Sequence, residues 1–238
     1  MLGDELIALL GDRIPDDHAR QWLADRWVPR FYATRPGGAR VVDLGCGIGE
    51  SLDLFRAHDP AVRWVGVDLE DSPEVRERTR GDAEFLTFDG AAIPLPDASV
   101  DLVYSKQVFE HVERPRPLLA DVARVLRPGG WFCGSLSQME PYHSLSVGGY
   151  TPSGWTTVVE ETGLRVVELR PGIDAAALLV RRLLGMPAFA DRWFAGTSPL
   201  HRALRRHPRL RGGGPRVHNA ARLMVSGQFA FLARRPED

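Results

Sequence analysis

Residues 41–49 run Val-Val-Asp-Leu-Gly-Cys-Gly-Ile-Gly, and this stretch decides the fold class. An apolar β-branched start leads to an acidic residue, Asp43, and then to three alternating glycines, Gly45, Gly47 and Gly49. This pattern predicts a buried strand that turns tightly into a helix, because glycine lets backbone approach a ligand where a Cβ would collide. The spacing is G-x-G-x-G, whereas dinucleotide sites use G-x-G-x-x-G.

The acidic residue favours a cationic ligand at this turn. Dinucleotide sites bring a pyrophosphate to the helix N-terminus, whereas the carboxylate of Asp43 suits the ammonium of an amino acid. Asp68 ends a second apolar run about twenty residues further on, where a carboxylate accepts both ribose hydroxyls. Asp89 follows a third run. Three acids at successive strand ends beside a glycine turn point to S-adenosylmethionine.

From residue 40 onward, short β-rich runs alternate with helical segments, which is typical of βαβ units and a parallel sheet. The predicted strands are residues 40–44, 63–67, 84–88, 100–104, 130–135, 164–169 and 226–234. The predicted helices are residues 5–10, 17–28, 50–58, 73–79, 107–112, 117–126, 154–161 and 175–184. The sequence therefore predicts an α/β chain in one domain.

Composition limits the partners. A chain of 238 residues with 44% hydrophobic content can bury one core, and its net charge of -1 provides no global field for nucleic acid or an anionic membrane. The longest apolar run, near residues 175–180, is too short to cross a bilayer. Cys46 and Cys133 are too few for a disulfide framework, so a cytoplasmic location is expected.

Further motifs extend the cofactor pattern. Residues 88–101 (Phe-Asp-Gly-Ala-Ala-Ile-Pro-Leu-Pro-Asp-Ala-Ser-Val-Asp), 108–112 (Val-Phe-Glu-His-Val) and 124–130 (Arg-Val-Leu-Arg-Pro-Gly-Gly) follow in order. With the glycine turn they closely resemble the class I S-adenosylmethionine-dependent methyltransferases, over roughly residues 38–136. The resemblance implies a Rossmann-like seven-stranded sheet in the order 3-2-1-4-5-7-6 with strand seven antiparallel.

The resemblance also implies which residues hold the cofactor. They are, for the methionine portion, Asp43, Gly45, Cys46 and Gly47, flanked by Ser105 and Gln107; for the ribose, Asp68 with Leu69; and for the adenine, Asp89 with Gly90 and Ala91.

The candidate acceptor loop is residues 137–155, just past the fifth predicted strand, at the edge where open α/β sheets bind ligands. His143 titrates near neutrality and is the candidate general base, with Glu140 orienting it or acting as the base, and Tyr142 flanking the acceptor. The alternative for His143 is a surface histidine. Glu110 and His111 form a reserve pair, with helix packing as their alternative role.

The acceptor itself is interpreted from weaker signals. The aromatic stretch 149–155 suits stacking on a sugar face or capping a helix, and the downstream sequence resembles bacterial methyltransferases that act on sugar hydroxyls. A saccharide O-methyltransferase is therefore expected. The alternatives are O- or N-methylation of another natural product and a non-catalytic S-adenosylmethionine-binding module. Whether Glu140, His143 and Asp174 hold a Mg²⁺ ion is left open.

Two segments flank the core. Residues 1–35 are expected to form an N-terminal helical cap, and residues 171–221 a helical insertion between strands six and seven. The insertion ends in an arginine-rich stretch, residues 201–218, that suits a phosphate, a carboxylate or nucleic acid. A solvated lid over the acceptor or a contact in a homodimer is the preferred interpretation, and these two stay open.

Overall fold

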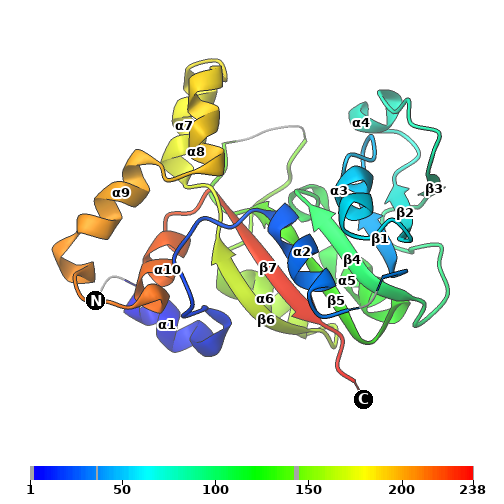
Figure 1. The fold of residues 1–238 in the computed structure, drawn as a ribbon, viewed down its shortest axis with the longest axis horizontal. Helices are drawn as coiled ribbons and strands as arrows, with labels where there is room; N and C mark the ends of the chain where they lie inside the picture. The colour runs from blue at the N-terminus through cyan, green and yellow to red at the C-terminus, as the bar shows by residue number, and fades with distance from the viewer. Residues whose placement is uncertain (1–2, 36, 142–144, 238) are drawn as a thin grey trace.

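The computed structural model describes residues 3–35, 37–141 and 145–237, and over these ranges the chain forms a seven-stranded sheet in the order β3-β2-β1-β4-β5-β7-β6 (Figure 1). β7 runs antiparallel to both β5 and β6, while the remaining neighbours pair in parallel. The strands are β1 (Arg40–Leu44), β2 (Arg63–Asp68), β3 (Glu84–Thr87), β4 (Val100–Lys106), β5 (Leu126–Ser137), β6 (Arg165–Pro171) and β7 (Gln228–Arg234). This order confirms the expected methyltransferase sheet.

Helices cover both faces of the sheet. Side chains of a strand alternate between the two faces, so both faces carry apolar residues that the helices bury. Val42 packs on the side of α5 (Pro115–Val125) and α6 (Pro152–Glu160), whereas Val41 packs on the side of α2 (Trp27–Tyr32) and α3 (Ser51–His58). α3 follows the carboxyl end of β1, and the turn η3 (Phe109–His111) follows that of β4, so the predicted site residues lie at one edge of the sheet. Short α4 (Pro73–Arg76) and η3 replace the longer helices predicted there.

The predicted helix over residues 17–28 is wrong. After α1 (Asp4–Leu10) and η1 (Gly11–Arg13), the chain runs irregularly until η2 (Ala24–Arg26) and α2. The backbone N–H of Trp22 donates to Pro171 O over 2.9 Å, so the irregular segment bonds to the end of β6. Trp27 is fully buried, and its Nε1 donates to Gly134 O. The side chains of this segment therefore pack on the sheet without forming one continuous helix.

The insertion between β6 and β7 is helical, as predicted. Its elements are α7 (Ala175–Leu183), η4 (Ala188–Asp191), α8 (Arg192–Ala195), α9 (Pro199–Arg206), η5 (Pro208–Leu210) and α10 (Pro215–Leu223). In Figure 1 the yellow α7 and α8 stand away from the sheet, and α10 lies beside α1. Within the described ranges, no helix has the length and apolar character needed to cross a membrane.

Candidate cofactor and acceptor site

The glycine turn after β1 requires its glycines. Gly45, Gly47 and Gly49 have φ values of 70°, 51° and 85°, in the left-handed region that side-chain-bearing residues rarely adopt. A Cβ built on Gly45 would lie 2.4 Å from Val108 Cγ2. The turn therefore packs against the segment after β4 through bare backbone.

Asp43 lies beneath this turn at the end of β1, with only 4% of its surface exposed. Its Oδ2 accepts a hydrogen bond from Ser51 Oγ, the first residue of α3, over 2.5 Å. Burial raises the pKa of Asp43 to about 7 against the opposing effect of the Ser51 bond, and the nearby Asp68 raises it further. A buried carboxylate in this state is stabilised by a cationic partner.

Asp68 ends β2 and is held by backbone. Gly47 N donates to its Oδ2 over 2.7 Å, and Leu69 N donates to its Oδ1 over 2.8 Å. Each carboxylate oxygen retains a further lone pair for a hydroxyl donor. Cys46 is a free, buried thiol whose pKa is raised by burial and by the nearby charges of Asp43 and Asp68. The predicted methionine and ribose residues therefore lie together.

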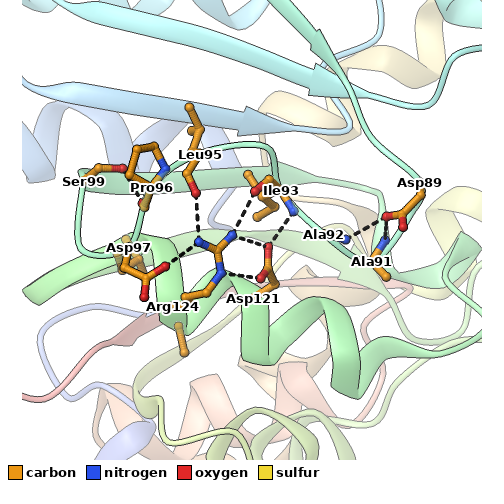
Figure 2. A network of polar contacts seen from close by, with 12 residues as sticks. Asp89, Ala91, Ala92, Ile93, Leu95, Pro96, Asp97, Ser99, Asp121 and Arg124 are labelled. Carbon is orange, nitrogen blue, oxygen red and sulfur yellow. Dashed lines mark hydrogen bonds and ion pairs between the residues drawn. The ribbon is translucent and has the colours of Figure 1, made fainter.

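The loop after β3 is fixed by α5 (Figure 2). Asp89 Oδ1 accepts hydrogen bonds from Ala91 N and Ala92 N, which closes the loop around Gly90. The guanidinium of Arg124 donates to the carbonyl oxygens of Ile93 and Leu95, while also pairing with Asp97 and Asp121. A helix of the core thus determines the shape of the predicted adenine loop.

The end of β4 supplies the next predicted residues. Ser105 is 1% exposed, and its Oγ has no partner among the described residues. Lys106 Nζ lies 3.3 Å from Asp25 Oδ1, so the N-terminal segment reaches the edge of the sheet near Asp43. Gln107 has a φ of 57°, and its backbone N–H donates to Ser135 O. That left-handed turn directs the chain toward η3.

A partly buried polar cluster, here called the carboxylate cluster, forms where the chain leaves β4 and β5 and enters β7. Its members are Gln107, Glu110, Ser137, Glu140 and Gln228. Ser137 Oγ lies 3.0 Å from Glu110 Oε1 and 2.7 Å from Glu140 Oε2. Gln228 Nε2 donates to Glu140 Oε2 over 2.6 Å. The Gln107 amide is oriented with its nitrogen toward Glu110 Oε1, 2.8 Å away, since that orientation satisfies both of its ends.

The two carboxylates of this cluster differ in exposure. Glu110 is fully buried, and burial raises its pKa to about 7, with the like charge of Glu140 adding to the shift. Glu140 is half-buried. Its described hydrogen bonds, from Ser137, Gln228 and the Gln107 amide, all reach Oε2, which leaves Oε1 without a partner among the described residues. Glu140 is therefore the member of the pair that can meet an acceptor.

The structure describes only some of the other predicted acceptor residues. Tyr142 and His143 lie outside the described residues. Trp155 is fully buried against Phe109 in the core, and Thr151 Oγ1 caps α6 by accepting from Gly154 N. The aromatic stretch thus caps a helix and fills the core, and Trp155 is not a stacking surface for a sugar.

The candidate metal ligands do not gather in the part of the chain that the structure describes. Asp174 caps α7 by accepting from Ala177 N over 2.8 Å, and it faces His201. Within residues 3–35, 37–141 and 145–237, no group of three or more His, Cys, Asp or Glu side chains could hold a metal ion.

Sequence analysis missed three contributors to this site. Ser51 is an ordinary helix-start serine in the sequence, and Arg124 belongs to a quoted motif without an assigned role. Gln228 begins β7, 88 positions after Glu140. No local pattern signals the Gln228 contact, because it arises from the antiparallel pairing of β5 with β7.

Comparisons with known proteins agree with this geometry. Residues 42–134 match the methyltransferase domain family. A probable S-adenosylmethionine-dependent methyltransferase from Mycolicibacterium smegmatis is 39% identical over 101 residues, which cover 42% of this chain and 38% of the relative. The matched region is therefore similar to the S-adenosylmethionine-dependent methyltransferases, and the sheet has the strand order of their Rossmann-like fold.

More distant relatives cover more of the chain. An O-methyltransferase from Aspergillus nomiae is 28% identical over 159 residues, which cover 59% of this chain and 71% of the relative. An S-adenosylmethionine-dependent methyltransferase structure from Mesorhizobium loti has a TM-score of 0.55 and 20% identity, covering 89% of this chain and 98% of that one. The chain spans well under half of the M. smegmatis relative. The shared region therefore identifies the domain and leaves the acceptor open.

Proposed function

We propose that this protein transfers the methyl group of S-adenosylmethionine to a hydroxyl of a small molecule, with a saccharide as the acceptor class. The observation that carries the proposal is the carboxylate cluster at the end of β5, beside a glycine turn suited to the donor. When bound, S-adenosylmethionine supplies an electrophilic methyl group on a sulfonium.

The residues at the glycine turn fit the donor. The ammonium of its methionine portion would lie near Asp43, whose buried carboxylate lacks a cationic hydrogen-bond partner among the described residues. The backbone of Gly45, Cys46 and Gly47 would contact the same methionine portion. The buried hydroxyl of Ser105, which has no partner among the described residues, would be available to hydrogen-bond it.

The rest of the donor would extend along the next two strand ends. Asp68 with Leu69 would accept the ribose hydroxyls, since both of its oxygens retain lone pairs. Asp89, Gly90 and Ala91 would border the adenine, in the loop that Arg124 holds. Gln107 would flank the methionine portion from the β4 side.

Glu140 would be the general base. Transfer forms a bond between the acceptor oxygen and the methyl carbon and breaks the carbon–sulfur bond, whose electron pair stays on sulfur. The hydroxyl proton then passes to Oε1 of Glu140. Ser137 and Gln228 orient the other carboxylate oxygen, and general-base catalysis of this kind contributes about 10²–10⁴-fold. His143 stays the second candidate base, with Tyr142 beside the acceptor.

A saccharide suits this cluster because its neighbouring hydroxyls need several hydrogen-bond partners at once. Glu140, Gln107 and Gln228 bring carboxylate and amide groups to one place. The similarity to an O-methyltransferase also supports oxygen as the nucleophile. A polar cluster of this kind favours a polyhydroxyl acceptor over a flat apolar phenol.

The test is an acceptor screen that follows S-adenosylhomocysteine release with mono- and oligosaccharides, phenols and amines. Each reaction is run with Mg²⁺ and with a chelator. Turnover with saccharides alone is expected. Turnover only with phenols or amines would overturn the saccharide assignment, and donor binding without turnover on any acceptor would favour a non-catalytic binding module. Loss of turnover with the chelator would add Mg²⁺ to the site.

The insertion carries exposed apolar side chains that suit a contact between two copies. They are Leu179, Leu183, Leu184, Met186 and Phe189. Exposed apolar patches commonly mark interaction surfaces. A homodimer through α7 and η4 predicts a dimeric mass in solution for the native chain and a monomeric one for Leu183→Glu. A monomeric mass for the native chain would leave the insertion as a lid.

A further inference from the structure

A cationic pocket of about 570 Å³ lies between the N-terminal segment and the insertion. The two segments lie side by side, because Asn219 Nδ2 on α10 donates to Pro15 O and His18 O. In Figure 1 this is where the blue chain after α1 passes the orange α10. The ionisable lining residues are all basic: His18, Arg20, Arg26, Arg205, His218 and Arg222.

Arg222 is the buried member of this set. It is 4% exposed and donates from one terminal nitrogen to Ala19 O, while its Nε has no partner among the described residues. Burial and the like charge of Arg205 lower its pKa from the usual arginine range. A buried charge with an unsatisfied donor is costly unless an acceptor meets it. Arg222 therefore points to an anionic ligand.

Two acids of the chain act on the pocket. Asp17 pairs with Arg170 over 2.7 Å and lies 3.9 Å from His18. Asp174 caps α7 through Oδ1, and its negative charge partly offsets the lowering of the Arg222 pKa. Within the described ranges, the ion pairs of the chain include none formed by Arg20 or Arg205, both of which are exposed at the pocket. The charges of Arg20 and Arg205 are thus compensated by no ion pair among the described residues.

We propose that this pocket binds the phosphate group of a small molecule. An arginine guanidinium can donate two parallel hydrogen bonds to two oxygens of one phosphate. Three segments of the chain bring arginines together at this pocket. The volume falls within the range of about 300–1,000 Å³ typical of small-molecule sites and exceeds that of a lone phosphate. The phosphate belongs either to a phosphorylated sugar or to a free polyphosphate, and both present the same dianionic group. The pocket shares no lining residue with the glycine turn or the carboxylate cluster.

The test is calorimetric binding to the full chain, with neither donor nor turnover involved. The probes are inorganic pyrophosphate, glucose 1-phosphate and glucose at constant ionic strength. Saturable binding of both phosphates and none of glucose is expected. Arg205→Gln and Arg20→Gln should each weaken binding about tenfold or more, since a charge-assisted hydrogen bond contributes about 1.5–3 kcal/mol.

Arg206→Gln is the matched control, because Arg206 is an exposed neighbour on α9 that does not line the pocket. It should bind as the native chain does. Tighter binding of glucose 1-phosphate identifies a sugar phosphate as the ligand, and tighter binding of pyrophosphate identifies a free polyphosphate. Absence of saturable phosphate binding, or equal weakening in Arg206→Gln, would overturn the proposal. Arg205 and Arg20 are exposed, so their variants test binding without disturbing the fold.

Discussion

Ser51 Oγ donates its hydrogen bond to Asp43 Oδ2 over 2.5 Å, at the point where β1 passes through the glycine turn into α3. Trp64 Nε1 donates to the same hydroxyl over 3.0 Å, so the single hydroxyl proton is directed at the carboxylate. Asp43 is thereby held in place beneath the turn. Its raised pKa of about 7 makes its charge sensitive to pH near neutrality.

Asp43→Asn is expected to weaken S-adenosylmethionine binding about tenfold or more, because the ammonium loses its carboxylate. In the native protein, affinity should rise between about pH 6 and about pH 7.5 as Asp43 ionises, while the α-amino group remains largely protonated. Calorimetry across this range measures both effects. Asp43→Asn should abolish the slope, and an unchanged slope in the variant would assign the titration to another group.

Glu110→Gln is expected to stabilise the protein at about pH 8. The folded state holds the Glu110 proton more tightly than the unfolded state, since the pKa rises from 4.5 to about 7. The contribution of Glu110 to the free energy of unfolding therefore falls as pH rises from 4.5 to 7. Glutamine does not ionise, so the variant does not lose this free energy. Urea unfolding should show a gain on the order of 2 kcal/mol.

Glu161→Gln is the control for that change, because Glu161 is exposed and pairs only with Arg116 among the described residues. Its effect should stay within about 0.5 kcal/mol at either pH. A Glu110→Gln variant that is less stable than the native chain at about pH 8 would contradict the account of the buried carboxylate.

Glu140→Gln is expected to lower kcat by about 10²–10⁴-fold while leaving the Kd for S-adenosylmethionine unchanged. The glutamine keeps the shape of the side chain but cannot take the hydroxyl proton. Steady-state kinetics with the acceptor found by screening, together with donor calorimetry, separate the two effects. Full activity in Glu140→Gln with loss in His143→Ala would transfer the role of base to His143.

Arg124→Met is expected to weaken donor binding about tenfold, because the adenine loop loses its bonds at Ile93, Leu95 and Asp97 (Figure 2). The methionine keeps most of the apolar stem of the side chain. Arg116→Gln, on the same helix, removes only an exposed ion pair and should have no effect on donor affinity. Equal donor affinity in Arg124→Met and the native chain would show that the loop keeps its shape without α5.

The core of the fold could be predicted because its signals are local. Each parallel strand is a short apolar run followed by a turn, and the acids at the ends of β1 and β2 fall where the runs stop. The predicted helix at 17–28 failed because the four-residue spacing of Leu23 and Trp27 matches a helix, while hydrogen bonding to the end of β6 sets the actual backbone.

The sequence alone did not predict contacts between segments that lie far apart along the chain. Gln228 reaches Glu140 only because β7 lies antiparallel to β5, and Arg222 reaches the N-terminal segment only because α10 packs beside it. The arginine-rich stretch 201–218 drew attention by composition, yet the buried arginine of the cationic pocket lies just beyond it. Burial and pairing in space, not local pattern, distinguish Arg222 from its exposed neighbours.

The most direct test of the account is calorimetric titration of the native chain with S-adenosylmethionine, S-adenosylhomocysteine and NAD⁺. The account predicts saturable one-site binding of the first two ligands and none of the dinucleotide, because a carboxylate beneath the glycine turn selects an ammonium over a pyrophosphate. Binding of NAD⁺, or no binding of S-adenosylmethionine, would contradict it.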